Sequence, residues 1–303
     1  MFVSSPVVSD VKFSIIIPTY NRPRQLHNCL SSLVTLNYPR ELFEVIVVDD
    51  GSRTEQSAVI DAVVRKLNIS LVKQKNLGPA AARNVGAKHA KGDFLVFIDD
   101  DCYPDVQWLK VLAQQLQKNP QCLIGGRTIN ALLDNPYAAT SQLIFDVVYQ
   151  HYNTNPKHTL FLGANSMAVS VQLFQSLCGF NINFRTAEDR EFCDRWLTQG
   201  YSMHYCADAI VYHTHALTLT GFCRQHFNYG RGAYRFHALC ASRQSDSRHK
   251  AIKLHSNFRN WLVDPLRQLE KSKRLATAAL LILWQVVNAL GFLWQAGLSA
   301  VKP

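Results

Sequence analysis

Three consecutive aspartates, Asp99, Asp100 and Asp101, directly follow an apolar run over residues 94–98. Adjacent carboxylates beyond a buried strand repel one another unless a cation or hydrogen-bond donors compensate their charge. Hard oxygen ligands of this kind suit Mg²⁺ or Mn²⁺. The alternative is that they cap a helix beginning near Pro104, although one aspartate would suffice for that. The string therefore predicts a site for a divalent metal.

Two histidines occur late in the chain, after a strand-like run over residues 209–212. His213 follows this run directly, and His215 lies two residues further on. A neutral imidazole at a strand end can complete a metal shell that already contains Asp101. An ordinary solvated loop histidine is the alternative. Of the two, we favour His213 as the metal ligand.

A second acidic pair, Glu188 and Asp189, opens a helical pattern with Phe192, Trp196 and Leu197 on its apolar stripe. The first turn of a helix favours acidic residues through capping and the helix dipole. By residue type alone, this pair is therefore interpreted as helix caps.

The elements that position these residues alternate between short apolar runs and amphipathic helical patterns, which is typical of an α/β sheet with helices on both faces. We expect strands near 13–17, 45–48, 71–73 and 94–98, and helices from 23, over 55–67 and over 79–90. Ligands of open α/β sheets bind beyond the carboxyl ends of the strands, where these carboxylates collect. The sequence has no GxGxxG after the first strand and no P-loop string, which argues against a dehydrogenase or a P-loop enzyme.

Five ordered strings make the chain resemble the inverting glycosyltransferases of family two, which have the GT-A fold. They are IIIPTYN over 15–21, VIVVDDGS over 45–52, NLGPAAARN over 76–84, IDDD over 98–101 and AEDR over 187–190. They are spread over residues 15–190, more than half of the chain. The resemblance implies an α/β fold of the GT-A type, with a Rossmann-like open sheet, helices on both faces and an additional C-terminal helical segment.

The resemblance also implies which residues hold the donor. The nucleotide base is expected to contact Pro18, Thr19, Tyr20 and Asp50, since a Tyr ring can stack on a base and a carboxylate can accept from a pyrimidine N–H. Arg83 resembles the family arginine near the nucleotide and its phosphates. Asp99 and Asp100 are expected to reach the ribose, and Asp101 to reach the metal that bridges the phosphates. The alternatives are a loop aspartate, a half-buried aromatic residue and a helix-surface arginine.

For the acceptor side, the resemblance changes the interpretation of the second acidic pair. Asp189 is expected to be the general base that takes the proton of the acceptor hydroxyl, with Glu188 as an acceptor ligand or as the alternative base. Asn165, just before a predicted strand over 166–169, is a weak candidate for contacting the acceptor.

The chain has 303 residues and a formal net charge of +10, which is concentrated near its C-terminal end. Twelve lysines and arginines lie between residues 224 and 274, against three acidic residues. Such a block suits anionic lipid, phosphates or nucleic acid. We divide the chain into a glycosyltransferase domain over 1–215 (nucleotide-sugar half about 11–127, acceptor half about 128–215), a basic helical extension over 216–270 and a hydrophobic C-terminal helix over 271–303.

Residues 275–301 contain no charge and would span about 40 Å as one helix. Five polar residues fall on one narrow stripe of this helix: Thr277, Gln285, Asn288, Gln295 and Ser299. This pattern fits a spanning helix, an in-plane helix, a helix packed on a partner subunit in a homo-oligomer, or a buried helix of the main domain. The basic flank favours the cytoplasmic face of a membrane. Residues 1–10 show no signal-peptide pattern, so we expect the catalytic part to stay in the cytoplasm.

The sequence therefore predicts metal-dependent, inverting transfer of a sugar from a nucleotide diphosphate, with UDP favoured, to a hydroxyl of a glycan or lipid-linked acceptor. Polysaccharide, glycolipid or cell-envelope glycan synthesis would use such an enzyme. A catalytically inactive nucleotide-sugar-binding membrane scaffold is the main alternative. A nucleotidyltransferase is less favoured, because no glycine-rich loop follows the first strand. Nucleic acid is not expected as a partner, because the aromatic residues of the basic block are spaced for helix packing.

Overall fold

A computed structural model describes residues 11–153, 159–243 and 259–300 of the chain. Its strands are β1 (Phe13–Thr19), β2 (Phe43–Asp49), β3 (Ile69–Lys73), β4 (Phe94–Phe97), β5 (Cys102–Pro104), β6 (Leu123–Asn130), β7 (Met167–Ser170) and β8 (Met203–His213). Its α-helices are α1 (Pro23–Leu33), α2 (Ser57–Asp61), α3 (Pro79–His89), α4 (Trp108–Lys118), α5 (Pro136–Tyr152), α6 (Val171–Ser176), α7 (Glu188–Thr198), α8 (Leu219–Ser242), α10 (Asp264–Arg267) and α11 (Lys271–Ala300). Short helical turns cover Arg40–Leu42, Ala164–Ser166 and Arg259–Val263.

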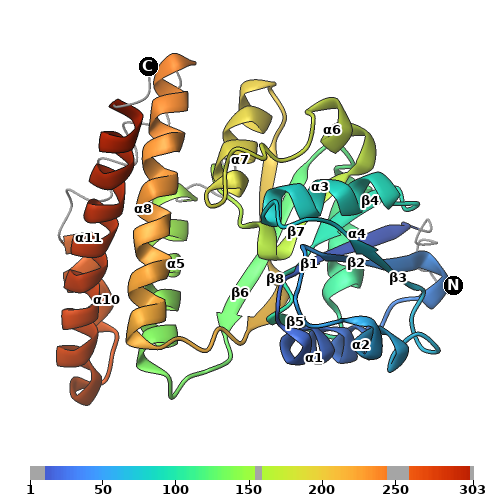
Figure 1. Ribbon diagram of the computed structural model, residues 1–303, viewed down its shortest axis with the longest axis horizontal. Coiled ribbons are helices and arrows are strands. Elements are labelled where there is room, and N and C mark those ends of the chain that lie inside the picture. Colours follow the sequence, from blue (N-terminus) through green and yellow to red (C-terminus); the bar gives the residue numbers. More distant parts are fainter. Residues whose placement is uncertain (1–10, 154–158, 244–258, 301–303) are drawn as a thin grey trace, which may run out of the picture. The chain divides into compact units, whose positions relative to one another are not determined.

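Within the described residues, all the strands join one mixed sheet in the order β3-β2-β1-β4-β7-β6-β8-β5 (Figure 1). Strands β3, β2, β1 and β4 run parallel, whereas β7 is antiparallel to both β4 and β6. The register matches Phe13 with both Phe43 and Phe94, so β1, β2 and β4 start level with one another. Their carboxyl ends consequently meet at one edge of the sheet, as the sequence predicts.

Alternating residues of β1 explain why helices cover both faces of this sheet. Ile15 and Ile17 pack into a core with residues of α1 and α4, including Leu26 and Trp108. Ile16 faces the other way and lies against α3, where a Cβ added to Gly86 would come within 2.4 Å of its side chain. Because both faces are covered, the strand is apolar throughout, as is typical of buried parallel strands. The predicted α/β class is confirmed.

One predicted helix is shorter than expected, and α4 begins later than the alternative start near Pro104. The helix expected over 55–67 is α-helical only over Ser57–Asp61 and then continues as turns. β-branched residues such as Val63 and Val64 follow, and they are poor helix formers. No helix begins near Pro104, because that residue ends β5 and α4 begins at Trp108 after an N-cap at Gln107. The three aspartates therefore cannot cap this helix.

The chain divides into two compact units. Unit 1 comprises 1–128, 162–180 and 196–212, and unit 2 comprises 129–161, 181–195 and 213–303. The core of unit 2 lies among α5, α8 and α11 and includes Val147, Phe222 and Trp284. By length and composition, α11 qualifies as a membrane span. The predicted functional boundaries at 215 and 270 stay a prediction, and residues 1–10 and 244–258, the latter part of the basic block, lie outside the described residues.

All eight cysteines lie in the described part of the chain, and none of them forms a disulfide there. Seven are buried or half-buried, whereas Cys178 is exposed in a turn with a positive φ of 59°.

Candidate active site

Three strand ends of unit 1 bring the predicted donor-binding residues together. Asp50 N donates to Thr19 O at 2.9 Å, which ties the end of β2 to the end of β1. The Thr19 hydroxyl donates to Asp100 Oδ2 at 2.7 Å, which ties β1 to the acidic string after β4. All three side chains are buried. Their proximity follows from the parallel register, since each lies where its strand ends.

Arg22 compensates the charge of this acidic string. Its Nη1 lies 3.1 Å from Asp100 Oδ1 and 3.0 Å from Asp101 Oδ2, while its side chain is 44% exposed. The motifs that predict the donor site do not include this arginine. Its position between the IIIPTYN string and the Pro23 that opens α1 was the available signal, because it places Arg22 in the loop at the same sheet edge. In this structure, the charge compensation expected for adjacent carboxylates comes partly from this guanidinium.

The charged form of Asp100 is destabilised in the folded protein. Burial raises its pKa from 3.8 to about 6, the guanidinium of Arg22 opposes this rise, and the neighbouring charge of Asp101 adds to it. Between about pH 4 and pH 6 the folded protein therefore keeps a proton that the unfolded chain has released. Stability consequently falls as the pH rises through this window. At roughly 1.4 kcal/mol per pKa unit, the loss at neutral pH is about 3 kcal/mol.

We therefore expect Asp100→Asn to stabilise the metal-free protein. In EDTA, the difference in urea midpoint between variant and parent should be near zero at about pH 4 and largest above about pH 6.5. Part of the gain is offset, because the variant loses the charged pair with Arg22. Asp208→Asn, at an exposed position on β8, is the control and should keep a urea midpoint close to that of the parent. A variant less stable than its parent above pH 6.5 would contradict the assignment.

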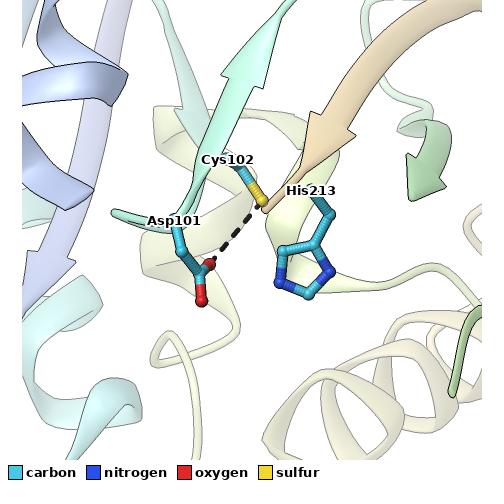
Figure 2. A group of neighbouring side chains, drawn as sticks. All are labelled: Asp101, Cys102 and His213. Atoms are coloured by element: carbon cyan, nitrogen blue, oxygen red, sulfur yellow. Dashed lines mark hydrogen bonds between the residues drawn. The ribbon is translucent and has the colours of Figure 1, made fainter. Parts of the chain in front are cut away.

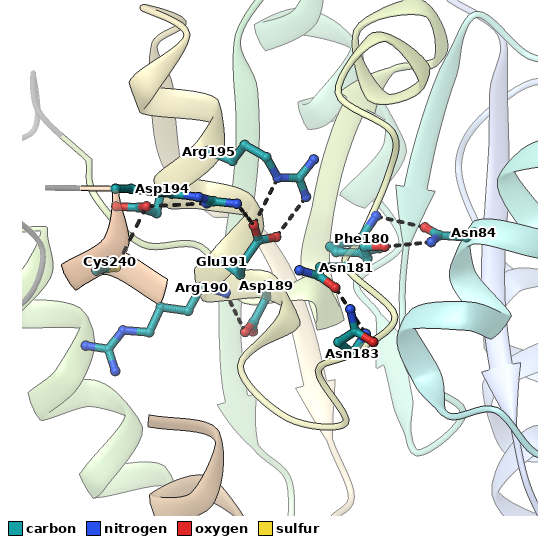
Figure 3. Close-up of polar contacts among 11 residues, drawn as sticks. Asn84, Phe180, Asn181, Asn183, Asp189, Arg190, Glu191, Asp194, Arg195 and Cys240 are labelled. Carbon is teal, nitrogen blue, oxygen red and sulfur yellow. Dashed lines mark hydrogen bonds and ion pairs between the residues drawn. The ribbon is translucent and has the colours of Figure 1, made fainter. Parts of the chain in front are cut away.

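Arg83 is a buried residue of α3, so the helix-surface alternative is wrong for it. Its Nη2 lies 2.6 Å from Asp99 Oδ1, and its guanidinium lies 5.8 Å from the ring centroid of Phe180. The amide of the next residue, Asn84, exchanges two hydrogen bonds with the backbone of Phe180, at 2.7 and 2.8 Å (Figure 3). These two hydrogen bonds fix α3 and thereby hold Arg83 in contact with the acidic string.

Asp50 anchors the loop that enters α3. Its carboxylate accepts from Gln74 Nε2 at 2.6 Å and from the backbone N–H groups of Leu77 and Gly78 at 2.8 and 2.9 Å. Gly78 has a φ of 95°, a conformation that favours glycine. A base contact from Asp50 stays a prediction, and the same carboxylate has a structural task in this loop.

The loops after β1 and β2 also hold each other. Asn21, in the left-handed region with φ 55°, donates its N–H to Ser52 Oγ at 2.7 Å and accepts from Arg53 N at 2.8 Å. Tyr20, just before it, is 43% exposed, so its ring is accessible for stacking. Pro18 pairs with Val48 within the sheet and is half-buried.

The candidate metal site contains Asp101, Cys102 and His213, whose potential ligand atoms all lie within 4.8 Å of one another (Figure 2). Neighbouring strands explain this approach. Asp105 N donates to Ile210 O at 2.9 Å, and the rings of Tyr103 and Tyr212 stack at 5.2 Å. Tyr103 thus lies beside Tyr212 on the neighbouring strand. One residue back along β5 and one residue forward along β8, Cys102 lies near His213. His215 lies beside His213, and the centroids of the two rings are 5.0 Å apart.

The donor set fits a Mg²⁺ or Mn²⁺ ion. Asp101 supplies a carboxylate oxygen and His213 an imidazole nitrogen, both of which suit Mn²⁺, while carboxylate and water suit Mg²⁺. Burial raises the pKa of the Cys102 thiol well above its usual value, so this sulfur stays protonated and is a poor ligand for such an ion. The acidic string provides the negative charge that attracts the cation.

The second acidic pair lies in unit 2, at the start of α7. Glu188 is buried and Asp189 half-buried, and Asp189 Oδ1 accepts from Arg190 N at 2.8 Å (Figure 3). The residue before them, Ala187, has a φ of 68°, a strained conformation for a side chain with a Cβ. The Thr186 hydroxyl donates to Asn228 O of α8 at 2.9 Å and pins this turn. A plain helix cap requires no such strain.

A buried charge cluster fixes α7 itself. Glu191 is fully buried and accepts from Arg195 at 3.1 and 2.8 Å (Figure 3). It also accepts from Arg243 at 3.1 Å. Arg190 directly follows the acidic pair in the sequence. Its guanidinium lies 4.7 Å from the ring centroid of Tyr152 and 4.9 Å from that of Phe236. Burial lowers its pKa to about 10, so it stays charged at neutral pH. These contacts leave the first turn of α7 little freedom.

Asn165 lies half-buried in the turn Ala164–Ser166, just before β7. Its neighbour Ser166 accepts from Trp108 Nε1 at 3.1 Å, so the turn is fixed to α4. The predicted contact of Asn165 with the acceptor stays a prediction.

The sequence model of glycosyl transferase family 2 matches residues 14–175, more than half of the chain. The chain belongs to glycosyltransferase family 2. The resemblance inferred from the five strings is thereby confirmed. The match contains the strand ends, the acidic string and Arg83, but it ends before the second acidic pair.

Two relatives show how far similarity to this family 2 chain extends. Chondroitin synthase of Pasteurella multocida is 37% identical over 167 residues, which is 51% of this chain but only 16% of that protein. Glycosyltransferase AglE of Haloferax volcanii is 28% identical over 228 residues, 72% of each chain. This chain therefore spans a small part of the first relative and most of the second.

Solved structures confirm the GT-A fold expected for a family 2 member. The mannosyltransferase PcManGT from Pyrobaculum calidifontis, in complex with GDP-Man and Mn²⁺, superposes with a TM-score of 0.69 at 19% identity, covering 93% of this chain and 87% of that one. Staphylococcus aureus TarS 1–349 with UDP-GlcNAc gives a TM-score of 0.58 at 20% identity, covering 92% and 84%.

Proposed function

We propose that this family 2 protein transfers a sugar from a nucleotide diphosphate to a hydroxyl group, with inversion and with a divalent metal. The observation that carries the proposal is the convergence of Asp101 and His213 beside Asp99 and Asp100, at the sheet edge where the strands end. Polysaccharide, glycolipid or cell-envelope glycan synthesis is the proposed setting.

On the donor side, the proposed roles rest on the contacts of the strand ends described above. Tyr20 stacks on the base, and Thr19 and Asp50 bind next to it. Asp99 and Asp100 hold the ribose. Arg83, which Asp99 orients at 2.6 Å, binds near the phosphates, and Asp101 and His213 would hold the metal. When bound, the ion would offset the charge that develops on the departing nucleoside diphosphate.

On the acceptor side, we propose Asp189 as the general base that takes the proton from the attacking hydroxyl. Inversion requires a base on the face opposite the leaving group. The strained turn at Ala187 and the buried Glu191 cluster support this role, because they hold the first turn of α7 in place. Glu188, which is buried, binds the acceptor or replaces Asp189 as the base.

A UDP-sugar is the favoured donor, in line with the UDP-GlcNAc bound to TarS, although the mannosyltransferase holds GDP-Man. The favoured acceptor is a glycan or a lipid-linked molecule at the cytoplasmic face of a membrane. The basic flank and the length of α11 support that location.

A panel of UDP-, GDP- and dTDP-sugars tests this proposal without knowledge of the acceptor. We expect one nucleotide class to be hydrolysed with Mg²⁺ or Mn²⁺ and not with EDTA. His213→Ala should raise the metal concentration needed for half-maximal rate by at least about tenfold, whereas His204→Ala, on the same strand, should not. Nucleotide binding without hydrolysis across the panel would instead favour the inactive scaffold.

A further inference from the structure

The outward face of α11 is apolar from Leu275 to Leu298. Leu275 is 84% exposed, Leu293 65% and Trp294 59%. The other large apolar side chains that are exposed on this helix are Ile282, Val286, Leu290 and Leu298. At roughly 100° per residue, most of these side chains share one side of the helix. A helix at the surface of a soluble protein normally presents its polar side to water.

The central part of the polar stripe of α11 faces the protein instead. Asn288 Nδ2 donates to His226 O of α8 at 3.3 Å, and Arg231 Nε of α8 donates to Gln295 Oε1 at 3.3 Å. Gln295 is buried. Of the arrangements considered from the sequence, the structure thus shows the stripe paired with a helix of the same chain. Its polarity is the reverse of that of a water-facing helix.

Two glycines allow α11 to approach α8 closely, and the two helices lie along each other (Figure 1). A Cβ added to Gly230 would lie 2.0 Å from Asn288 O, and one added to Gly291 would lie 2.0 Å from Phe227 O. If α11 crossed a bilayer with this packing intact, α8 would carry arginines such as Arg231 into the hydrocarbon. If α11 left α8, Gln295 would lose its partner there. Both outcomes are unfavourable in lipid.

The amino-terminal end of α11 is basic. It begins with Lys271, Lys273 and Arg274, although positive charge is unfavourable at a helix amino terminus. Lys273 has an exposed partner in Glu270 at 3.7 Å, and such surface pairs contribute little. Arg274 donates to Leu269 O at 3.0 Å and to Arg267 O at 3.3 Å and thus has a structural task, whereas the charges of Lys271 and Lys273 are exposed to solvent. They are complementary to the anionic headgroups of phospholipids.

We propose that α11 lies in the plane of an anionic membrane, with its outward apolar face inserted below the headgroups and α8 on the protein side. The basic end contacts the headgroups, and Trp294 sits at the interface that its amphipathic ring favours. The inference deepens the membrane location proposed above and is independent of the sugar-transfer reaction.

Vesicle flotation of the full chain tests the inserting face. We expect binding to phosphatidylcholine vesicles that contain phosphatidylglycerol, and weaker binding without that lipid or at high salt. Replacing Leu290 and Leu293 together by Glu should lower the affinity by at least about tenfold. Leu133→Glu, at another exposed leucine of unit 2, is the matched control and should bind normally. Metal-dependent donor hydrolysis in solution should be unchanged in both, which separates this inference from the proposed reaction.

Orientation is tested with the same vesicles. Vesicle binding should shift the tryptophan fluorescence of the parent to shorter wavelength, and lipids with a quencher near the headgroup should suppress this signal. Trp294→Phe should remove the shift, because the other tryptophan of α11, Trp284, is buried in the protein. A tag placed after Pro303 should stay open to protease in sealed vesicles. A protected tag would show a spanning helix and overturn the proposal. A dimer in solution that binds no vesicle and is dissociated by the double Glu variant would overturn it in favour of a second copy.

Discussion

Asp101→Ala is expected to abolish metal-dependent nucleotide binding and to leave the fold intact. Asp101 is a proposed metal ligand, and losing partners beyond the ligands already costs 10–100-fold in metal affinity. Removing a ligand should therefore weaken Mn²⁺-dependent UDP or GDP binding by at least about a hundredfold. The fold should persist, since the variant removes one of three adjacent carboxylates and leaves Arg22 paired with Asp100 at 3.1 Å.

Calorimetric titration of the nucleotide, with and without Mn²⁺, measures this effect. Asp208→Asn removes an exposed carboxylate of unit 1 and should bind as the parent does. Circular dichroism of both variants checks that the fold is retained. Unchanged Mn²⁺-dependent binding in a folded Asp101→Ala protein would show that the metal is held elsewhere or is not needed.

Asp189→Asn is expected to retain donor binding and to lower the rate of transfer by at least roughly a hundredfold, because a general base typically contributes 10²–10⁴-fold. Asn has nearly the same shape as Asp and can still accept the hydrogen bond from Arg190 N, which is 2.8 Å long in the parent. The start of α7 should therefore keep its conformation while losing the base.

Single-turnover transfer to the acceptor, together with donor affinity, separates chemistry from binding. Asp134→Asn, at an exposed position of unit 2, is the matched control and should transfer normally. Glu188→Gln decides between the two acidic residues, because it should mainly raise the KM for the acceptor if Glu188 binds it. Near-normal transfer by Asp189→Asn, with a large loss in Glu188→Gln, would move the base to Glu188.

Local sequence patterns were enough to predict the fold class, the family and the sheet edge where the strand ends meet. Apolar runs that end in Thr19, Asp50 and Asp99 indicate buried parallel strands, and parallel strands bring their ends to one edge. This inference needs only local pattern, which is why it was correct. Helix boundaries were less well determined, as at residues 55–67, because β-branched residues and turns decide where an amphipathic pattern stops being helical.

Tertiary structure decided which side chains meet. The approach of His213 to Asp101 depends on the register between β5 and β8, and the pairing of Arg22 with Asp100 depends on a loop from a different strand. Neither leaves a periodic signal in the chain, because pairing between distant segments is fixed by packing and not by local pattern. The same holds for α11: the sequence contains its polar stripe, but only the contact with α8 shows that the stripe is turned inward and the apolar face outward.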